Sequence, residues 1–296
     1  MGGSRPACVH ITTLATPETI IDYADPHPKS IICPTLSTTR TRTTFNYVSN
    51  ISFLRRSRVA GATFWSSSAR PLASHSDFAV GTSSSIVLIT PTESSWSFSQ
   101  SMSFLAPYSD GKAAEKDVLA LDWLTENTLL NGCRSGHIHL WDIRSATPAS
   151  TSCPIKHASS IAHARAQNEN VIVVAGIESQ LCSYDLRFLT SPYSSQSRAP
   201  TKPLLGFPAY RNQDLNGTAV GFDVKGDLIA AGTDDEKVQL FDAGTGRELQ
   251  AGPGGGLSRE KLMGTARCVK IVDGEAWGNE TSLYIAAGDR LEEWAW

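Results

Sequence analysis

The sequence has few of the features that mark a secreted, membrane-spanning or disulfide-linked protein. Its six cysteines are scattered along 296 residues, no two are spaced as Cys-x-x-Cys, and the opening MGGSRPACVH lacks the basic and apolar parts of a secretory signal. No apolar run approaches the ~18–20 residues that a membrane-spanning helix needs. Most of the cysteines lie in apolar runs, as reduced and buried thiols do. We therefore expect a protein of the nucleus or the cytoplasm, without a membrane partner.

Motifs for catalysis and cofactor binding are also scarce. No Gly-x-Ser-x-Gly nucleophile turn occurs, and no recognisable Ser/His/Asp set emerges. The run GPGGG (252–256) lacks the Lys-Ser/Thr of a phosphate-binding loop and is better explained as a linker between strands. The acidic run Asp234-Asp235-Glu236 falls where a hairpin turn is expected, and turns favour such residues. The sequence therefore predicts no cofactor and argues against an enzyme.

One group of residues invites a metal-site interpretation. Cys133, His137 and His139 lie near one another in a strand-like stretch, where alternate residues face the same side. Structural zinc normally takes four ligands, and the next candidates, Cys153 and His157, are too loosely placed to complete a site. We predict that these are ordinary strand residues and that no metal is bound.

The charge of the chain is low, but it is unevenly spread. The formal net charge is −3; residues 1–77 hold eight Lys/Arg against four Asp/Glu, a net +4, and the remainder holds 18 against 25, a net −7. The low total argues against a nucleic-acid partner. The acidic remainder leaves open a basic peptide as a partner.

What the chain does contain is a repeat of short β-rich runs separated by turn residues, in place of helical periodicity. Five runs align on the glycines at 81, 132, 176, 232 and 288, which are 51, 44, 56 and 56 residues apart. Self-similarity at about 40–50 residues is typical of an array of propeller blades. The aligned runs are DFAVGTSSSIVLIT (77–90), TLLNGCRSGHIHLWD (128–142), VIVVAGIESQLCSYD (171–185), DLIAAGTDDEKVQLFD (227–242) and SLYIAAGDRLEEWAW (282–296).

The most complete copy, 217–249, reads as four antiparallel strands joined by tight turns. It resembles a blade of the WD-repeat (WD40) family, whose third strand ends in Trp-Asp. That dipeptide stands here as Trp141-Asp142, Tyr184-Asp185 and Phe241-Asp242, so each copy keeps an aromatic residue between neighbouring sheets. The family's Gly-His is nearly absent, and Lys156-His157 is its closest substitute.

The resemblance implies an all-β fold, a single β-propeller over residues 1–296 with six or seven four-stranded antiparallel blades. We expect clear blades over 59–296, and a degenerate blade plus a closing strand within 7–58. The final run EEWAW is a third strand with no fourth after it, so a closed ring would take its last strand from about 7–14.

Two consecutive copies share a further pattern. Trp141-Asp142-Ile143-Arg144 and Tyr184-Asp185-Leu186-Arg187 both read aromatic, Asp, apolar, Arg, where the third strand ends. The pattern resembles the WDxR box of the substrate receptors of cullin-4 ubiquitin ligases, and the wider similarity to the group of the fourth numbered DDB- and cullin-4-associated factor covers about 117–296. Asp-x-Arg at a turn also often forms only a local ion pair.

The resemblance implies a non-catalytic interaction scaffold that is monomeric within a complex. Trp141, Asp142, Arg144, Tyr184, Asp185 and Arg187 would dock the ligase's adaptor propeller, and another face would hold a client protein. Two alternatives remain open: a WD40 adaptor of another complex that recognises a histone tail or other basic peptide, and a propeller hydrolase or lyase with a site in the central channel.

Overall fold

The computed structural model describes most of the chain from residue 64 onward and two short strands before it. In the described residues every regular element is a strand except the 3-10 helix η4 (Leu186–Phe188). No helix in this part of the chain is long and apolar enough to cross a membrane. The described residues are 31–34, 45–48, 64–71, 78–83, 85–91, 96–103, 117–145, 152–188, 200–213, 220–249, 262, 264–272, 281–288 and 290–295.

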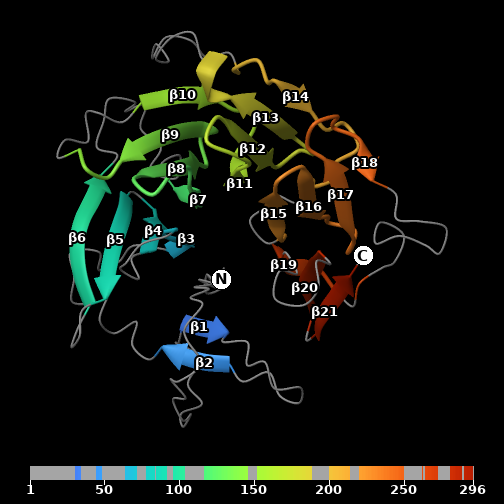
Figure 1. Ribbon diagram of the computed structural model, residues 1–296, viewed down its shortest axis with the longest axis horizontal. Coiled ribbons are helices and arrows are strands. Elements are labelled where there is room, and N and C mark those ends of the chain that lie inside the picture. Colours follow the sequence, from blue (N-terminus) through green and yellow to red (C-terminus); the bar gives the residue numbers. More distant parts are fainter. Residues whose placement is uncertain are drawn as a thin grey trace, which may run out of the picture.

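Strands β3 to β21 form five antiparallel sheets that stand around a common axis, and we name them blades I to V in chain order (Figure 1). Blade I contains β3 (Phe64–Ala69), β4 (Phe78–Thr82), β5 (Ser85–Pro91) and β6 (Trp96–Ser103). Blade II contains β7 (Val118–Trp123), β8 (Thr128–Cys133), β9 (His137–Asp142) and β10 (Ser152–Lys156). Blade III contains β11 (Ile161–Ala166), β12 (Val171–Gly176), β13 (Leu181–Asp185) and β14 (Leu205–Gly206). Blade IV contains β15 (Phe222–Lys225), β16 (Leu228–Gly232), β17 (Val238–Asp242) and β18 (Glu248–Leu249), and blade V contains β19 (Ala266–Val272), β20 (Ser282–Ala287) and β21 (Arg290–Ala295).

Local sequence explains the hairpins inside each blade. In blade IV, Lys225 pairs with Leu228, so residues 226–227 form a two-residue turn, and Gly226 adopts the φ of +55° that such turns favour. Apolar residues that alternate along the strands then face the neighbouring sheets. The sequence thus favours short hairpins whose two faces are both buried.

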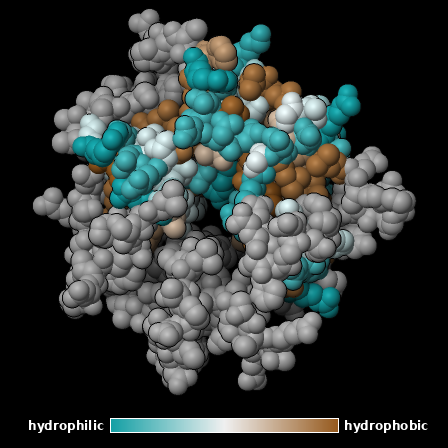
Figure 2. Space-filling view, viewed as in Figure 1, coloured by the Kyte–Doolittle hydropathy of each residue, from teal (hydrophilic) through white to brown (hydrophobic). Residues whose placement is uncertain are grey.

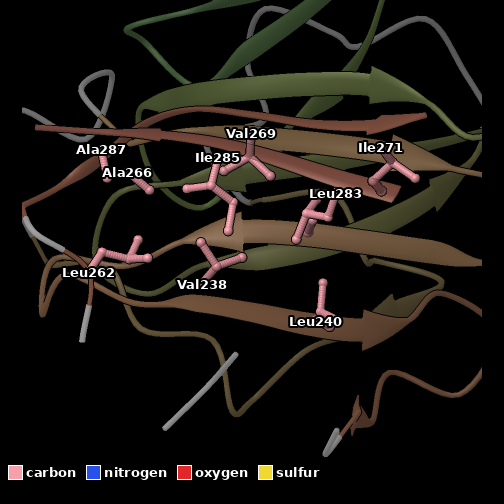
Figure 3. Packing of buried hydrophobic residues seen from close by; sticks show 10 residues of the cluster. Val238, Leu240, Leu262, Ala266, Val269, Ile271, Leu283, Ile285 and Ala287 are labelled. Carbon is pink, nitrogen blue, oxygen red and sulfur yellow. The ribbon is translucent and has the colours of Figure 1, made fainter. Parts of the chain in front are cut away.

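Four apolar clusters join the blades, one at each interface between consecutive blades. The cluster between blades IV and V is shown in Figure 3, where Val238 and Leu240 of β17 face Val269 and Ile271 of β19 and the side chains of β20. The aromatic residues that end the third strands lie in the other three clusters, each against the preceding blade. Trp141, Tyr184 and Phe241 are 3%, 2% and 0% exposed, which confirms their expected place between sheets.

Two of the repeated glycines, Gly81 and Gly132, lie where consecutive blades approach each other closely. A Cβ at Gly132 would lie 2.5 Å from Cγ2 of Ile161, in the first strand of blade III. A Cβ at Gly81 would lie 2.7 Å from the carbonyl oxygen of Val118, in the first strand of blade II. Both positions therefore need glycine for space, because any side chain there would push two sheets apart.

The fold is a β-propeller, but the expectation of six or seven four-stranded blades is wrong. The described residues form five blades, four with four strands and one, blade V, with three. The sequence places a degenerate blade and a closing strand within 7–58. The strands described in that range are only β1 (Ile31–Pro34) and β2 (Phe45–Val48). These pair with each other in a separate two-stranded sheet, and the closing strand expected at 7–14 lies outside the described residues.

Candidate functional site: two Asp-Arg forks on one rim

One rim of the propeller is defined by a backbone contact that recurs in three consecutive blades. The residue that follows the third strand donates its N–H to the turn between the first and second strands of the same blade. The turns after the third strands therefore lie on the same rim as the turns between the first two strands. The contacts are Ile143 N to Asn127 O at 3.0 Å, Leu186 N to Asn170 O at 2.8 Å, and Ala243 N to Asp227 O at 2.8 Å.

On this rim two consecutive blades carry the same pair of charged side chains. Arg144 binds Asp142 through Nε to Oδ1 at 3.0 Å and through Nη2 to Oδ2 at 2.6 Å. Arg187 binds Asp185 through the same atoms, also at 3.0 and 2.6 Å. The backbone N–H of each arginine donates to the same Oδ1, at 3.0 and 2.9 Å. We call each unit an Asp-Arg fork; the two forks follow β9 and β13 of neighbouring blades (Figure 1).

The forks hold the guanidinium groups in place without covering them. The side chains of Arg144 and Arg187 are 69% and 60% exposed. A guanidinium has five N–H groups, and the aspartate takes one from Nε and one from Nη2, so three remain directed elsewhere. Nη1 of either arginine makes no hydrogen bond with the described residues. Each fork can therefore present oriented donors to an oxygen acceptor on another molecule.

The two forks differ in how far the aspartate is shielded. The side chain of Asp142 is 39% exposed, whereas that of Asp185 is 6% exposed. The hydrogen bonds from Arg144 lower the pKa of Asp142 to about 2, and those from Arg187 lower the pKa of Asp185. Both carboxylates are therefore charged at neutral pH, and each fork is neutral as a unit.

Blade IV has no arginine two residues after the aspartate that ends its third strand, yet its turn still forms. In blade IV, Asp242 accepts from the N–H and the hydroxyl of Thr245 at 2.7 and 2.9 Å, and these contacts lower its pKa. The aspartate thus closes the turn after the third strand in all three blades. The arginine is an addition in blades II and III, because the blade IV turn forms without one.

The aromatic members of the predicted site lie elsewhere. Trp141 and Tyr184 were expected at the docking surface, but the structure places both in the clusters between blades. Both are almost fully buried there and pack the third strand from inside the propeller. The hydroxyl of Tyr184 lies 2.8 Å from Nδ1 of His157, the residue named above as the closest substitute for the Gly-His histidine.

One further residue of the rim, Phe188, does not belong to the pattern that the repeats share. Phe188 follows Arg187 directly, is 73% exposed and has the Arg187 guanidinium 5.6 Å from its ring centroid. The equivalent residues in blades II and IV are Ser145 and Thr245. The change of residue type can be seen in the sequence, but Phe188 lies beyond the aspartate at which the aligned runs end.

The other candidates from the sequence are the histidines of β9, the acidic turn of blade IV and the glycine run. His137 and His139 share one face of β9 with ring centroids 6.3 Å apart, and burial lowers the pKa of each to about 4. In the described part of the chain no three His, Cys, Asp or Glu side chains are grouped to hold a metal ion. Asp235, in the acidic turn of blade IV, binds Thr233 and Lys237. The glycine run 252–256 lies outside the described residues.

Carboxylates of the innermost strands also accept backbone N–H groups of the next blade. Asp122 of blade II accepts from the backbone N–H of Ala166 in blade III at 2.8 Å, and Asp223 of blade IV accepts from that of Ile271 in blade V at 2.9 Å. Burial raises the pKa of Asp122. These carboxylates therefore join consecutive blades close to the axis.

Comparison with known proteins supports the fold alone. No protein-family model and no curated protein matches the sequence. The β-propeller domain of Cps50 (Swd1) from Myceliophteria thermophila aligns with 80% of this chain and 71% of its own, at a TM-score of 0.53 and 14% identity. A chain of the Mitotic Checkpoint Complex aligns with 85% of this chain and 68% of its own length, at a TM-score of 0.49 and 16% identity. The computationally designed Ika8 protein aligns with 79% of this chain and 58% of its own length, at a TM-score of 0.47 and 13% identity. The fold and the first of these similarities define the class: this chain is a β-propeller protein.

Proposed function

We propose that the protein is a non-catalytic scaffold that binds other proteins through its rims, and that it is a substrate receptor of a cullin-4 ubiquitin ligase. The observation that carries the proposal is the pair of matching Asp-Arg forks on consecutive blades, with both guanidinium groups more than half exposed. The resemblance of the two sequences to the WDxR box supports the choice of the ligase adaptor as the partner. The nucleus or the cytoplasm is the compartment that fits this role.

Two aligned forks are suited to docking because they provide donors in a fixed geometry. An unrestrained arginine loses side-chain entropy when it binds, whereas an arginine already held by an aspartate loses less. The turn itself does not need the arginine, as Asp242 and Thr245 demonstrate in blade IV. A planar, multiply donating group held open on the surface has the form expected of an interface contact.

The mechanism is one of bringing two proteins together. The forks would contact the adaptor, and another face of the propeller would hold the client. A client held beside the ligase meets its ubiquitin-loaded enzyme at a raised effective concentration, with no bond made or broken by this chain. Because each fork is neutral as a unit, long-range attraction contributes little, and we expect docking to depend only weakly on salt.

The test is binding of the purified protein to the purified cullin-4 adaptor. We expect the double variant Arg144→Ala/Arg187→Ala to bind at least roughly tenfold more weakly than the wild type, because both sets of donors are lost. Arg247→Ala is the matched control, since Arg247 is an exposed arginine at the corresponding turn of blade IV but belongs to no fork. Its affinity should stay unchanged.

The lysine variants separate geometry from charge. Arg144→Lys/Arg187→Lys keeps both positive charges but cannot donate as a planar fork, so it should bind nearly as weakly as the alanine variant. All variants should keep the wild-type melting temperature within a few degrees, since the side chains are exposed. Wild-type affinity in the folded alanine variant, or no binding by the wild type, would reject the adaptor proposal.

A further inference from the structure

A second feature of the rim lies next to the blade III fork. The third residue after the strand-ending aspartate is Ser145 in blade II, Phe188 in blade III and Thr245 in blade IV. In blade II the N–H of Ser145 donates to the carbonyl of Asp142 at 3.0 Å, and in blade IV Thr245 binds the side chain of Asp242. A small hydroxyl residue therefore suffices for the turn, and the fold does not require a phenylalanine.

Phe188 is unusually placed for an aromatic residue. It is 73% exposed, the highest value for a large hydrophobic side chain in the described residues. The side chain contributes little to the core and leaves apolar surface in water, which disfavours it unless another molecule covers it. Neither the turn nor the core thus requires a phenylalanine at this position.

The ring is also held in position. The guanidinium of Arg187 lies 5.6 Å from the ring centroid of Phe188, and its Nε and Nη2 also bind Asp185. Cation–π attraction and the fork together restrain both side chains in a fixed relationship. Pre-ordering of an exposed aromatic residue and an arginine lowers the entropy that binding would cost, and both residue types are enriched at the centres of interfaces.

A second exposed apolar side chain lies on the same blade. Leu204 is 59% exposed, and its N–H donates to the carbonyl of Ser183 in β13 at 2.9 Å, so it runs along the outer side of the strand that leads to the fork. On the face shown in Figure 2, hydrophobic residues gather away from the axis in the region of blades III and IV. Phe188 and Leu204 are the two most exposed large hydrophobic residues in the described parts of the chain.

We infer that Phe188, with Leu204 on the same blade as a second exposed apolar side chain, is the apolar anchor of the interface on blade III. The partner that fits is a protein surface with an apolar socket bordered by carbonyl or carboxylate oxygens, which would accept the remaining N–H groups of Arg187. Nucleic acid fits poorly, because Asp185 neutralises the adjacent cation. A lipid surface fits poorly as well, because two apolar side chains beside an ion pair offer little area to bury.

This inference rests on the proposed function, and one experiment separates the two. The photoreactive amino acid p-benzoylphenylalanine replaces Phe188 in the full chain, with Leu291 of blade V, 49% exposed, as the matched control position. Purified cullin-4 adaptor is the probe. We expect a crosslink from position 188 and none from position 291. In the unlabelled protein, Phe188→Ala should weaken adaptor binding at least roughly tenfold while Leu291→Ala leaves it unchanged.

The outcomes divide cleanly. If the adaptor binds but neither crosslinks at position 188 nor responds to Phe188→Ala, the proposed function stands and the inference is overturned. If the adaptor does not bind, the proposed function fails, and crosslinking in cell extract decides the inference. The inference is supported if the crosslink identifies one protein and this protein, once purified, binds the Phe188→Ala and Arg187→Ala variants more weakly than the wild type. A crosslink within the chain, a crosslink to a second copy, or no crosslink overturns it.

Discussion

The hydroxyl of Tyr184 lies 2.8 Å from Nδ1 of His157, in a contact buried from solvent. Tyr184 belongs to β13 in blade III, and His157 follows β10, the outermost strand of blade II. The two side chains are 2% and 1% exposed, and their rings meet edge to face with centroids 6.0 Å apart. A single polar contact therefore joins the outer part of one blade to the third strand of the next.

Removal of this hydroxyl should destabilise the fold. Tyr184→Phe keeps the ring but leaves Nδ1 of His157 buried without its partner, so we expect the free energy of unfolding to fall by about 1–3 kcal/mol. Tyr284→Phe is the matched control: its hydroxyl also forms a 2.8 Å bond, to Glu293, but that bond is exposed, and its loss should cost less than about 1 kcal/mol. Urea unfolding measures both. Equal losses would show that burial of the contact is unimportant.

The same histidine should make stability depend on pH. Burial, helped by the positive charge of Lys156, lowers the pKa of His157 from its usual 6.5 to about 4. Between these values the unfolded chain takes up a proton that the folded chain does not, so stability is complete above pH 6.5 and falls as the pH falls towards 4. His157 alone should cost about 2 kcal/mol between pH 7.5 and 5. Burial lowers the pKa of His137, His139 and His163 in the same direction.

A variant without this titration provides the check. His157→Gln should be less stable than the wild type at pH 7.5, but the difference should shrink at pH 5, because glutamine takes up no proton in either state. Urea unfolding at the two pH values measures the difference. An unchanged pH dependence in His157→Gln would assign the acid sensitivity to other groups.

The sequence was informative where the same residue type recurs at the same position of several blades. Glycine occupies position 132 because two sheets meet there. Phe241 can take the place of the family's tryptophan because a large aromatic ring fills the interface between blades. The number of blades was not predictable in this way, because counting residues per blade assumes that every apolar run joins the ring. The run around β1 pairs only with β2 in the described residues.

The site was predictable only in part, for a related reason. Arg144 and Arg187 stand out because they repeat, and the aspartates beside them follow from the same pattern. Phe188 does not repeat, so a search for periodic features passes over it. Its meaning depends on its 73% exposure and on the Arg187 guanidinium over its ring, which are properties of the folded chain.

The glycine at the blade II–III interface should not tolerate a side chain. Gly132→Ala would place a methyl group 2.5 Å from Ile161, in the middle of a buried interface, and we expect a loss of about 1–3 kcal/mol in the free energy of unfolding. Gly206→Ala is the matched control, because a Cβ there meets no atom within 4 Å. That change should stay within about 0.5 kcal/mol of the wild type. A neutral Gly132→Ala would mean that the two sheets can move apart without cost.

The shielding of the aspartates predicts unequal forks. Asn has nearly the shape of Asp but no charge, so Asp185→Asn and Asp142→Asn each weaken the hold on the arginine. Asp185 is 6% exposed and Asp142 is 39% exposed, so water can replace the lost contact more readily in blade II. Adaptor binding should therefore fall further for Asp185→Asn than for Asp142→Asn, and calorimetric titration compares them. The reverse order would place the main contact at Arg144.

Asp223 should be important for holding the ring together, because it touches three blades. It lies in β15 of blade IV and accepts the backbone N–H of Ile271 at 2.9 Å; Lys270 Nζ lies 3.1 Å from its carboxylate and Arg165 Nε lies 4.0 Å from it. Asp223→Ala leaves a buried N–H without an acceptor and brings two positive charges together without their counter-ion, so we expect a loss of about 2–3 kcal/mol.

The control for this change is another aspartate on the same hairpin. Asp227 is exposed, and among the described residues its carboxylate makes a single long contact, 3.4 Å from Nε2 of Gln167 in blade III, so Asp227→Ala should alter the free energy of unfolding by less than about 0.5 kcal/mol. Asp223→Asn should fall between the two, because the amide oxygen can still accept from Ile271 while the charge is lost. Thermal unfolding orders the three variants. An Asp223→Ala protein as stable as the control would show that the blades are held by their apolar clusters alone.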